Sequence, residues 1–116
     1  MEIKRLEMVI IFVSDVEHSI SWYQDTLGMS LLSHHGDFAA LRAGESQIGL
    51  HGGANTGIDL RNAGTMPVFQ VSDYQMARDK LVSRGCEFIF EDSAGESQFG
   101  TFLDPDGNPL QIMQGA

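Results

Sequence analysis

The chain holds few side chains with the chemistry of a catalytic site, and His51 is the strongest of them. An imidazole ordinarily changes charge close to neutral pH, so a histidine can act as a general base, bind a metal ion or hydrogen-bond a ligand. A histidine with internal partners would play a structural role instead. No complete catalytic motif surrounds His51, so all of these roles stay open.

The short motifs typical of several enzyme classes are incomplete. Cys86 is the only cysteine, which excludes an internal disulfide and a cysteine-based zinc site. Gly52-Gly53 lacks the Lys-Ser or Lys-Thr of a phosphate-binding loop, and residues 95–100 miss the nucleophile-elbow spacing by one position. Residues 104–108 resemble part of a calcium loop without its final glutamate, and a tight turn explains them.

The elements that position the histidine begin with a buried strand. Residues 8–13 form a short β-branched and aromatic run, which is typical of such a strand. Ser14 and Glu17 have the spacing of a capping box at the start of a helix. Apolar positions then recur every three to four residues as far as Gly28, which predicts a helix of about three turns. Turn-like clusters separate three further strand candidates, at residues 29–35, 38–43 and 47–51.

The same order of elements begins again in the second half. Residues 67–71 are apolar except at Gln70, Ser72-Asp73 starts a helix, and Gly85 ends it. Ser72-Asp73 stands 58 residues after Ser14-Asp15, half the chain length, which indicates a duplicated β-α-β-β-β module. The remaining strand candidates lie at residues 86–90, 99–103 and 110–113, and residues 104–108 form the last hairpin turn.

A shorter repeat does not follow this period. Residues 43–49 (AGESQIG) recur almost unchanged at residues 94–100 (AGESQFG), 51 positions later. This offset is out of register with the modules, so we interpret the repeat as reuse of turn chemistry or as chance.

Length and composition limit the classes of function. With 116 residues, 42% hydrophobic and 20% charged, the chain can form one domain over residues 1–116, with module one at about 5–52, a linker at 53–65 and module two at about 66–114. The linker is long enough to be mobile or to fold over a site. A net charge of -9 opposes nucleic acid and anionic membrane as partners and attracts small cations. The sequence holds no membrane-spanning run or signal peptide, so we expect a cytoplasmic protein.

The helix motif and the late turn together carry a family resemblance. Residues 13–20 (VSDVEHSI), 22–28 (WYQDTLG) and 104–108 (DPDGN) resemble the vicinal oxygen chelate superfamily, which includes glyoxalase I, extradiol dioxygenases and fosfomycin- and bleomycin-resistance proteins. The resemblance covers nearly the whole chain. It implies an α+β fold in which two tandem βαβββ modules form a cup from a curved mixed sheet, and it implies a homodimer.

Enzymes of this superfamily bind a divalent metal ion through His or Glu at four strand positions, and the sequence departs from that pattern. The resemblance places these positions at Met8, His51, Met66 and Gln111. Thioethers and amides are weak ligands for magnesium, manganese, zinc or nickel. The sequence therefore predicts no metal cofactor, and the alternative is a divalent ion at a non-standard site.

Strand alternation predicts which other side chains line the cup, because residues two apart share a face. With Met8 facing the cup, Ile11 and Val13 pack against the helix instead. A buried Gln70 amide would need a partner, either the ligand or the neighbouring Gln111. The predicted ligand-binding residues are Met8, Ile10, Phe12, His51, Met66, Val68, Gln70, Gln111 and Met113.

These features predict a metal-free protein, similar to the bleomycin-resistance branch, that holds a small organic molecule in an apolar cup. The alternative is a lyase, isomerase or dioxygenase of the same superfamily, with a displaced metal site or with His51 as the catalytic residue. Phe99 and Phe102 either stack on a planar ligand or pack in the core. His34 and His35 are either solvated turn residues or contacts at the cup rim.

Overall fold

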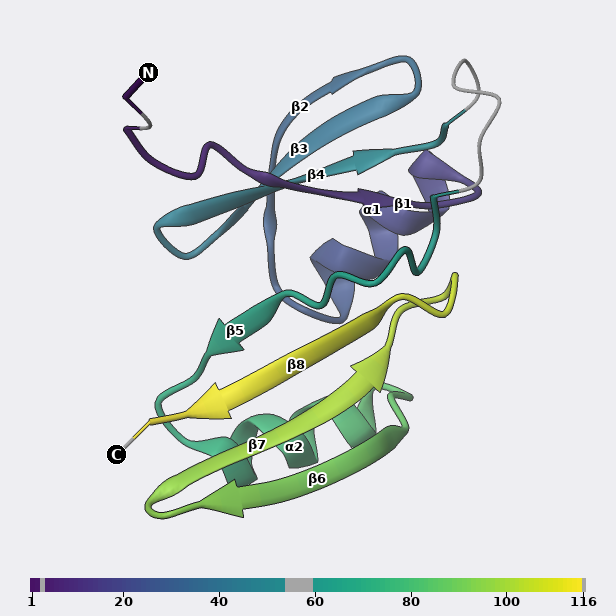
Figure 1. Cartoon of the computed structure of the whole chain (residues 1–116). Helices are drawn as coiled ribbons and strands as arrows, with labels where there is room; N and C mark the ends of the chain where they lie inside the picture. Colours follow the sequence, from purple (N-terminus) through teal and green to yellow (C-terminus); the bar gives the residue numbers. More distant parts are fainter. Residues whose placement is uncertain (3, 54–59, 116) are drawn as a thin grey trace. The chain divides into compact units, whose positions relative to one another are not determined.

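The computed structural model describes residues 1–2, 4–53 and 60–115, which fall into two compact units, Met1–Arg61 and Asn62–Ala116 (Figure 1). The first unit contains β1 (Val9–Phe12), α1 (Val16–Asp25), β2 (Ser30–His35), β3 (Phe38–Ala43) and β4 (Ser46–His51). The second contains β5 (Val68–Gln70), α2 (Tyr74–Ser83), β6 (Phe88–Ala94), β7 (Ser97–Leu103) and β8 (Pro109–Gln114).

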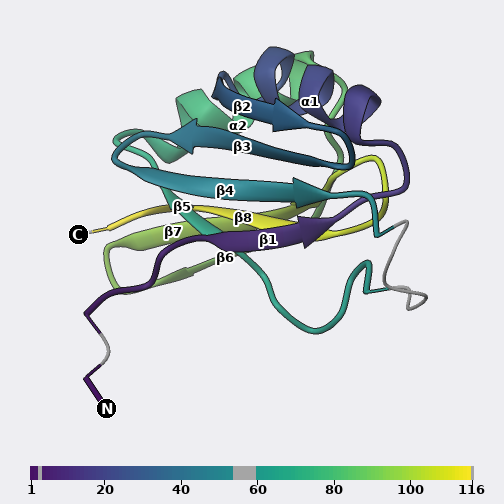
Figure 2. The ribbon, with the colours of Figure 1, turned by 90° about the horizontal axis from the view of Figure 1, so that it is seen from above.

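Both units have the same sheet topology. The strand order is β1-β4-β3-β2 in the first sheet and β5-β8-β7-β6 in the second. In each sheet the first strand pairs parallel with the last, and the other pairs are antiparallel. Figure 2 shows the four strands of the first sheet side by side in this order. The predicted duplication of a β-α-β-β-β module within an α+β fold is therefore confirmed.

The first unit buries one face of its sheet under α1. The apolar stripe of the helix, with Val16, Ile20 and Tyr23, is buried, as the periodicity predicts. Ile11 and Val13 from the first strand are buried as well. Each fully buried side chain of this size contributes roughly 1.5–3 kcal/mol relative to an exposed one, so this stripe fixes which sheet face the helix covers.

The second unit buries one face of its sheet under α2. Tyr74 and Leu81 are the buried side chains of α2, and Phe102, Leu110 and Ile112 are the buried side chains of the sheet beneath. Figure 1 shows α2 lying across one face of this sheet. The sequence left open whether Phe102 stacks on a ligand or packs in the core. Its ring is fully buried and packs in the core.

The helices begin one residue later than the capping-box spacing predicts. Asp15, not Ser14, is the N-cap of α1, and its carboxylate accepts a hydrogen bond of 3.1 Å from the backbone N–H of His18. Asp73 caps α2 in the same way and accepts from the N–H of Met76 at 3.0 Å. The capping box with Glu17 was therefore the wrong motif, because the Asp carboxylate at the next position accepts from the third N–H of the helix.

The repeated AGESQ segments are both hairpin turns. Gly44 and Gly95 have φ values of 62° and 63°, as the first central residue of a type II′ turn requires. The first segment joins β3 to β4 and the second joins β6 to β7, so they occupy different places in the two modules. The interpretation as reused turn chemistry fits this arrangement. The predicted linker at 53–65 falls largely on residues 54–59, outside the described residues.

Candidate functional site

The face of the first sheet that α1 does not cover is the first half of the candidate site. Ile10 pairs with Gly49 and Phe12 pairs with His51, so these four residues share one face. Phe38 pairs with His51 from the other side. This surface, which we call the first open face, consists of Met8, Ile10, Phe12, Phe38, Ala40, Gly49 and His51.

His51 lies between two aromatic rings on the first open face. The centroid of its ring is 5.2 Å from that of Phe12, with the planes at 36°, and 6.1 Å from that of Phe38, with the planes at 70°. The backbone N–H of Gly53 donates a 2.7 Å hydrogen bond to His51 Nδ1. A backbone group therefore orients this imidazole, and among the described residues no carboxylate bonds to it.

Gly49 makes a close contact possible in the middle of this face. A Cβ atom at Gly49 would lie 2.9 Å from the end of the Phe38 ring and 3.1 Å from Met8 Sδ. The ring and the thioether therefore occupy the space that a longer side chain at residue 49 would need. Prediction of the first open face from β1 and β4 alone missed Phe38, although alternation within β3 would have found it.

The strand register corrects one assignment made by resemblance. Gln111 of β8 pairs with Val68 in the second sheet, and its counterpart in the first sheet is the residue paired with Ile10. That residue is Gly49 and not His51, whose counterpart is Met113. The position equivalent to Gln111 in the first module is therefore a glycine, which has no side chain that could bind a ligand or an ion.

The second open face is the corresponding surface of the second sheet, opposite α2. Pairing of Val68 with Gln111 and of Gln70 with Met113 places these predicted residues together. Phe99 pairs with Met113 and lies on the same face, unlike Phe102. The second open face consists of Met66, Val68, Gln70, Phe90, Asp92, Phe99, Thr101, Gln111 and Met113.

A short hydrogen-bond chain crosses the second open face. The Gln111 amide Nε2 donates to Thr101 Oγ1 at 3.3 Å, and this hydroxyl donates to Met66 Sδ at 3.8 Å. Gln111 and Thr101 are only 8% and 7% exposed. The two positions that the resemblance assigns to metal ligands in this module, Met66 and Gln111, are thus linked through Thr101. The sequence reasoning missed Thr101, which the pairing of β7 with β8 would have revealed.

Two other polar positions differ from the predictions. Gln70 was expected to be a buried amide beside Gln111, but its side chain is exposed, because it lies one pair further along the short edge strand β5. His34 lies near the end of β2, beside the turn, where its Nε2–H donates to the carbonyl oxygen of Gly36 at 3.0 Å. This bond supports the turn interpretation for His34. His35 pairs with Phe38 and is exposed.

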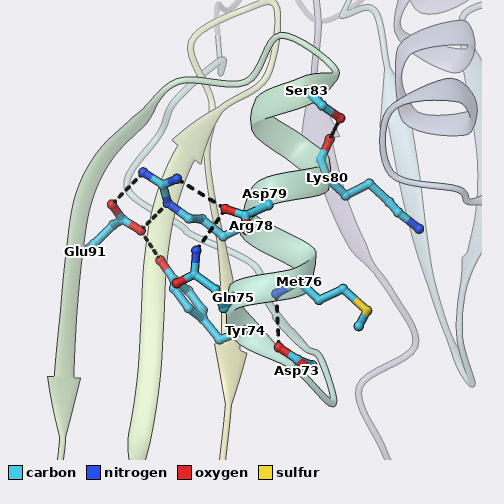
Figure 3. Close-up of polar contacts among 9 residues, drawn as sticks. All are labelled: Asp73, Tyr74, Gln75, Met76, Arg78, Asp79, Lys80, Ser83 and Glu91. Carbon is cyan, nitrogen blue, oxygen red and sulfur yellow. Dashed lines mark hydrogen bonds and ion pairs between the residues drawn. The ribbon is translucent and has the colours of Figure 1, made fainter.

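A third polar cluster joins α2 to β6 on the covered side of the second sheet. Figure 3 shows Tyr74 and Arg78 pointing toward Glu91. The Tyr74 hydroxyl donates to Glu91 Oε1 at 2.6 Å, and Arg78 Nε donates to the same oxygen at 2.9 Å. Hydrogen bonding from Arg78 and Tyr74 lowers the pKa of Glu91, while burial and this carboxylate raise the pKa of Tyr74. The cluster fastens the helix to the sheet, away from the second open face.

The described residues do not fit a divalent metal ion. Among residues 1–2, 4–53 and 60–115, no three His, Cys, Asp or Glu side chains come together in a group that could hold one. At the positions implied by resemblance stand two thioethers, an amide already bonded to Thr101 and, by register, Gly49. Such donors suit neither hard ions nor zinc.

Comparison with known proteins places this geometry in a family. The model of the Glyoxalase/Bleomycin resistance protein/Dioxygenase superfamily matches residues 5–112. The chain belongs to this superfamily. A search of curated protein sequences found no match. Superfamily membership fixes the arrangement of strands and helices, whereas the chemistry depends on the residues of each open face.

Solved structures of the superfamily fold cover the chain from end to end. An integron cassette protein from V. cholerae has a TM-score of 0.80 and 21% identity, with 100% of this chain and 98% of that chain covered. A putative glyoxalase family protein from Bacillus anthracis has a TM-score of 0.79 and 19% identity over 100% and 98%. An antibiotic binding protein from a Streptomyces species has a TM-score of 0.80 and 20% identity over 100% and 99%. In the part of the chain that the structure describes, no helix is long and apolar enough to cross a membrane.

Proposed function

We propose that the chain binds a small, largely apolar organic molecule on its open faces and uses no metal ion to do so. The observation that carries this proposal is the content of the superfamily's metal positions. They hold Met8, Gly49, Met66 and Gln111, and none of these is a good ligand for a divalent ion.

Exposed apolar side chains on the open faces support a ligand of this kind. Ile10 is 44% exposed, Val68 is 49% exposed and Phe90 is 52% exposed. Ile10 lies on the first open face, and Val68 and Phe90 lie on the two edge strands of the second, so each open face offers apolar side chains to a ligand. Met8 and Met66 add flexible thioethers that adapt to ligands of irregular shape.

The environment of Gly49 also favours binding without a metal. A carboxylate at this position would have to displace the Phe38 ring, so the first open face is packed for contact with carbon and not for coordination. On the second open face, the Gln111 amide is already engaged with Thr101. The antibiotic binding protein of similar fold is consistent with a role in binding small molecules.

The second function, catalysis assisted by His51, has less support. A general base is commonly oriented by a carboxylate that stabilises the imidazolium form. Here the orienting group is the Gly53 N–H, which bonds to the unprotonated Nδ1. Homodimer formation and a cytoplasmic location remain predictions from the resemblance and from the sequence.

Metal analysis combined with a thermal-shift screen tests the proposal. Protein purified without chelator should contain far less than one equivalent of nickel, zinc, manganese or iron, and small aromatic or cationic compounds should raise Tm in a concentration-dependent way. Near-stoichiometric metal, or a turnover activity abolished by His51→Ala, would contradict the proposal.

A matched pair of variants locates the binding surface. Ile10 on the first open face and Val82 on α2 are 44% and 43% exposed. Ile10→Gln should reduce the ligand-induced rise in Tm, whereas Val82→Gln should leave it unchanged. Equal loss in both variants would place binding elsewhere.

A further inference from the structure

We propose that His51 determines ligand specificity on the first open face by donating its Nε2–H to an acceptor oxygen at the edge of a planar aromatic ligand. This inference rests on the proposed function, and it names the ligand class and the residue that selects it.

The bond from Gly53 fixes the position of the imidazole proton. Because the backbone N–H of Gly53 donates to Nδ1 at 2.7 Å, Nδ1 carries a lone pair and not a hydrogen. In a neutral imidazole the other ring nitrogen then carries the proton. His51 therefore presents a donor at Nε2.

The Nε2 donor is available to a ligand. The His51 imidazole accepts a hydrogen bond from Gly53 and packs against Phe12 and Phe38, and among the described residues no hydrogen bond reaches its Nε2. No fully buried side-chain nitrogen or oxygen in that part of the chain lacks a partner, so the unpaired Nε2 is open to solvent. A ligand that covers this atom must replace the water or leave the donor unsatisfied.

The surroundings of the donor select a planar aromatic partner. Phe12 and Phe38 flank the imidazole with ring centroids at 5.2 Å and 6.1 Å. Aromatic rings pack favourably against one another in stacked or edge-to-face arrangements. Gly49 and the Met8 thioether continue the apolar surface beside His51, and the polar side chains of Gln47, Arg42 and His35 lie farther out on the same face. A flat ring packed between Phe12 and Phe38 has the His51 Nε2–H at its edge.

A site built in this way discriminates against analogues without an acceptor. Such an analogue would cover Nε2–H without pairing it, at the cost of desolvating the donor. The preference for the acceptor-bearing compound should be about five- to tenfold, which corresponds to one ordinary hydrogen bond.

The compounds 9-fluorenone and fluorene test this inference, because they share a planar tricycle and differ by one carbonyl group. Dissociation constants come from titrations followed by NMR of the full chain, and long-range ¹H–¹⁵N spectra of the histidine rings report the tautomer. We expect the wild type to carry the His51 proton on Nε2 and to bind fluorenone about five- to tenfold more tightly than fluorene. Addition of fluorenone, but not of fluorene, should shift the Nε2 resonance.

Variants of His51 show whether it acts as a hydrogen-bond donor or only as an aromatic ring. His51→Phe should bind both compounds with equal affinity, whereas His51→Gln, which retains an amide donor, should keep part of the preference. His18→Phe, on the exposed side of α1, is the matched control and should behave as the wild type does.

The outcomes distinguish this inference from the proposed function. If the wild type binds both compounds equally, or carries the proton on Nδ1, the specificity role of His51 is wrong while small-molecule binding stands. If neither compound binds, the proposed function fails for planar aromatic ligands, and this inference fails with it. The tautomer is measured in the wild type, so the test does not depend on a variant that folds.

Discussion

Gly49 and Gln111 occupy the same position in two sheets of the same topology, since Gly49 pairs with Ile10 and Gln111 pairs with Val68. The two modules have taken different routes at this position. In the first module the Phe38 ring covers a glycine, and in the second an amide is held by Thr101. Neither position carries a carboxylate or an imidazole.

Two glycines with close neighbours should differ in their tolerance of alanine. A Cβ at Gly49 would meet the end of the half-buried Phe38 ring, which can turn aside, so Gly49→Ala should cost less than about 1 kcal/mol. A Cβ at Gly100 would overlap the Tyr74 hydroxyl, which Glu91 holds, so Gly100→Ala should cost about 1–3 kcal/mol. Urea denaturation measures both. The explanation fails if Gly49→Ala is the more destabilising substitution.

The pH dependence of stability should follow the cluster of Tyr74, Arg78 and Glu91. The pKa of Glu91 is lowered in the folded state, so its contribution is present above the ordinary value of 4.5 and is lost as the pH falls through the folded pKa. The pKa of Tyr74 is raised, so its contribution is complete below the ordinary value of 10.0 and is lost as the pH rises above it.

Each single substitution in the cluster should weaken the dependence of the unfolding free energy on pH at one end of the pH range only. Glu91→Gln should reduce the loss of unfolding free energy as the pH falls below the ordinary value of 4.5, and Tyr74→Phe should reduce the loss as the pH rises above 10.0. Glu87→Gln removes an exposed carboxylate nearby and is the control. Unchanged acid and alkaline limbs in both cluster variants would show that the cluster does not control these transitions.

Most of the fold followed from the sequence because its signals are local. Residues 38–43 were predicted as a strand and form β3 with the same bounds, and the stripe of Val16, Ile20 and Tyr23 is buried as its spacing requires. The parity of β1 also held, since Ile11 is buried and Ile10 is exposed. Hydrophobic periodicity reports burial directly, so it predicts which face of an element is covered.

The candidate site was less predictable because it depends on pairing between strands. Alternation places His51 on an open face, but only the register shows that Gly49 is the counterpart of Gln111. Phe38 and Thr101 enter the site through β3 and β7, whose sequences alone do not show which residues they meet. Gln70 lies on the predicted face, yet the end of an edge strand leaves it exposed.

The N-cap of α2 can be tested directly, because the sequence placed the start of this helix at Ser72-Asp73 and the structure assigns the cap to Asp73. Asp73 accepts a hydrogen bond from the N–H of Met76, so Asp73→Ala should lower the free energy of unfolding by about 1 kcal/mol. Ser72→Ala, at the exposed preceding residue, should change it by less than about 0.5 kcal/mol. Thermal or urea denaturation measures both. If Ser72→Ala lowered the free energy of unfolding more than Asp73→Ala does, Ser72 and not Asp73 would be the N-cap.

The chain from Gln111 through Thr101 to Met66 should show strong coupling between its first two members. Thr101→Val removes the acceptor of the nearly buried Gln111 amide, and this unpaired donor should cost about 1–3 kcal/mol. Gln111→Leu alone should cost a similar amount, because it strands the Thr101 hydroxyl against the weak sulfur acceptor of Met66. The double variant replaces both polar partners with apolar groups, so its cost should be well below the sum of the two single costs. Met66→Leu is the control, and it should change stability little because it removes only the weak contact at 3.8 Å. Additive costs in the double variant would mean that the amide and the hydroxyl are not coupled, and that Gln111 is free to serve a ligand or an ion.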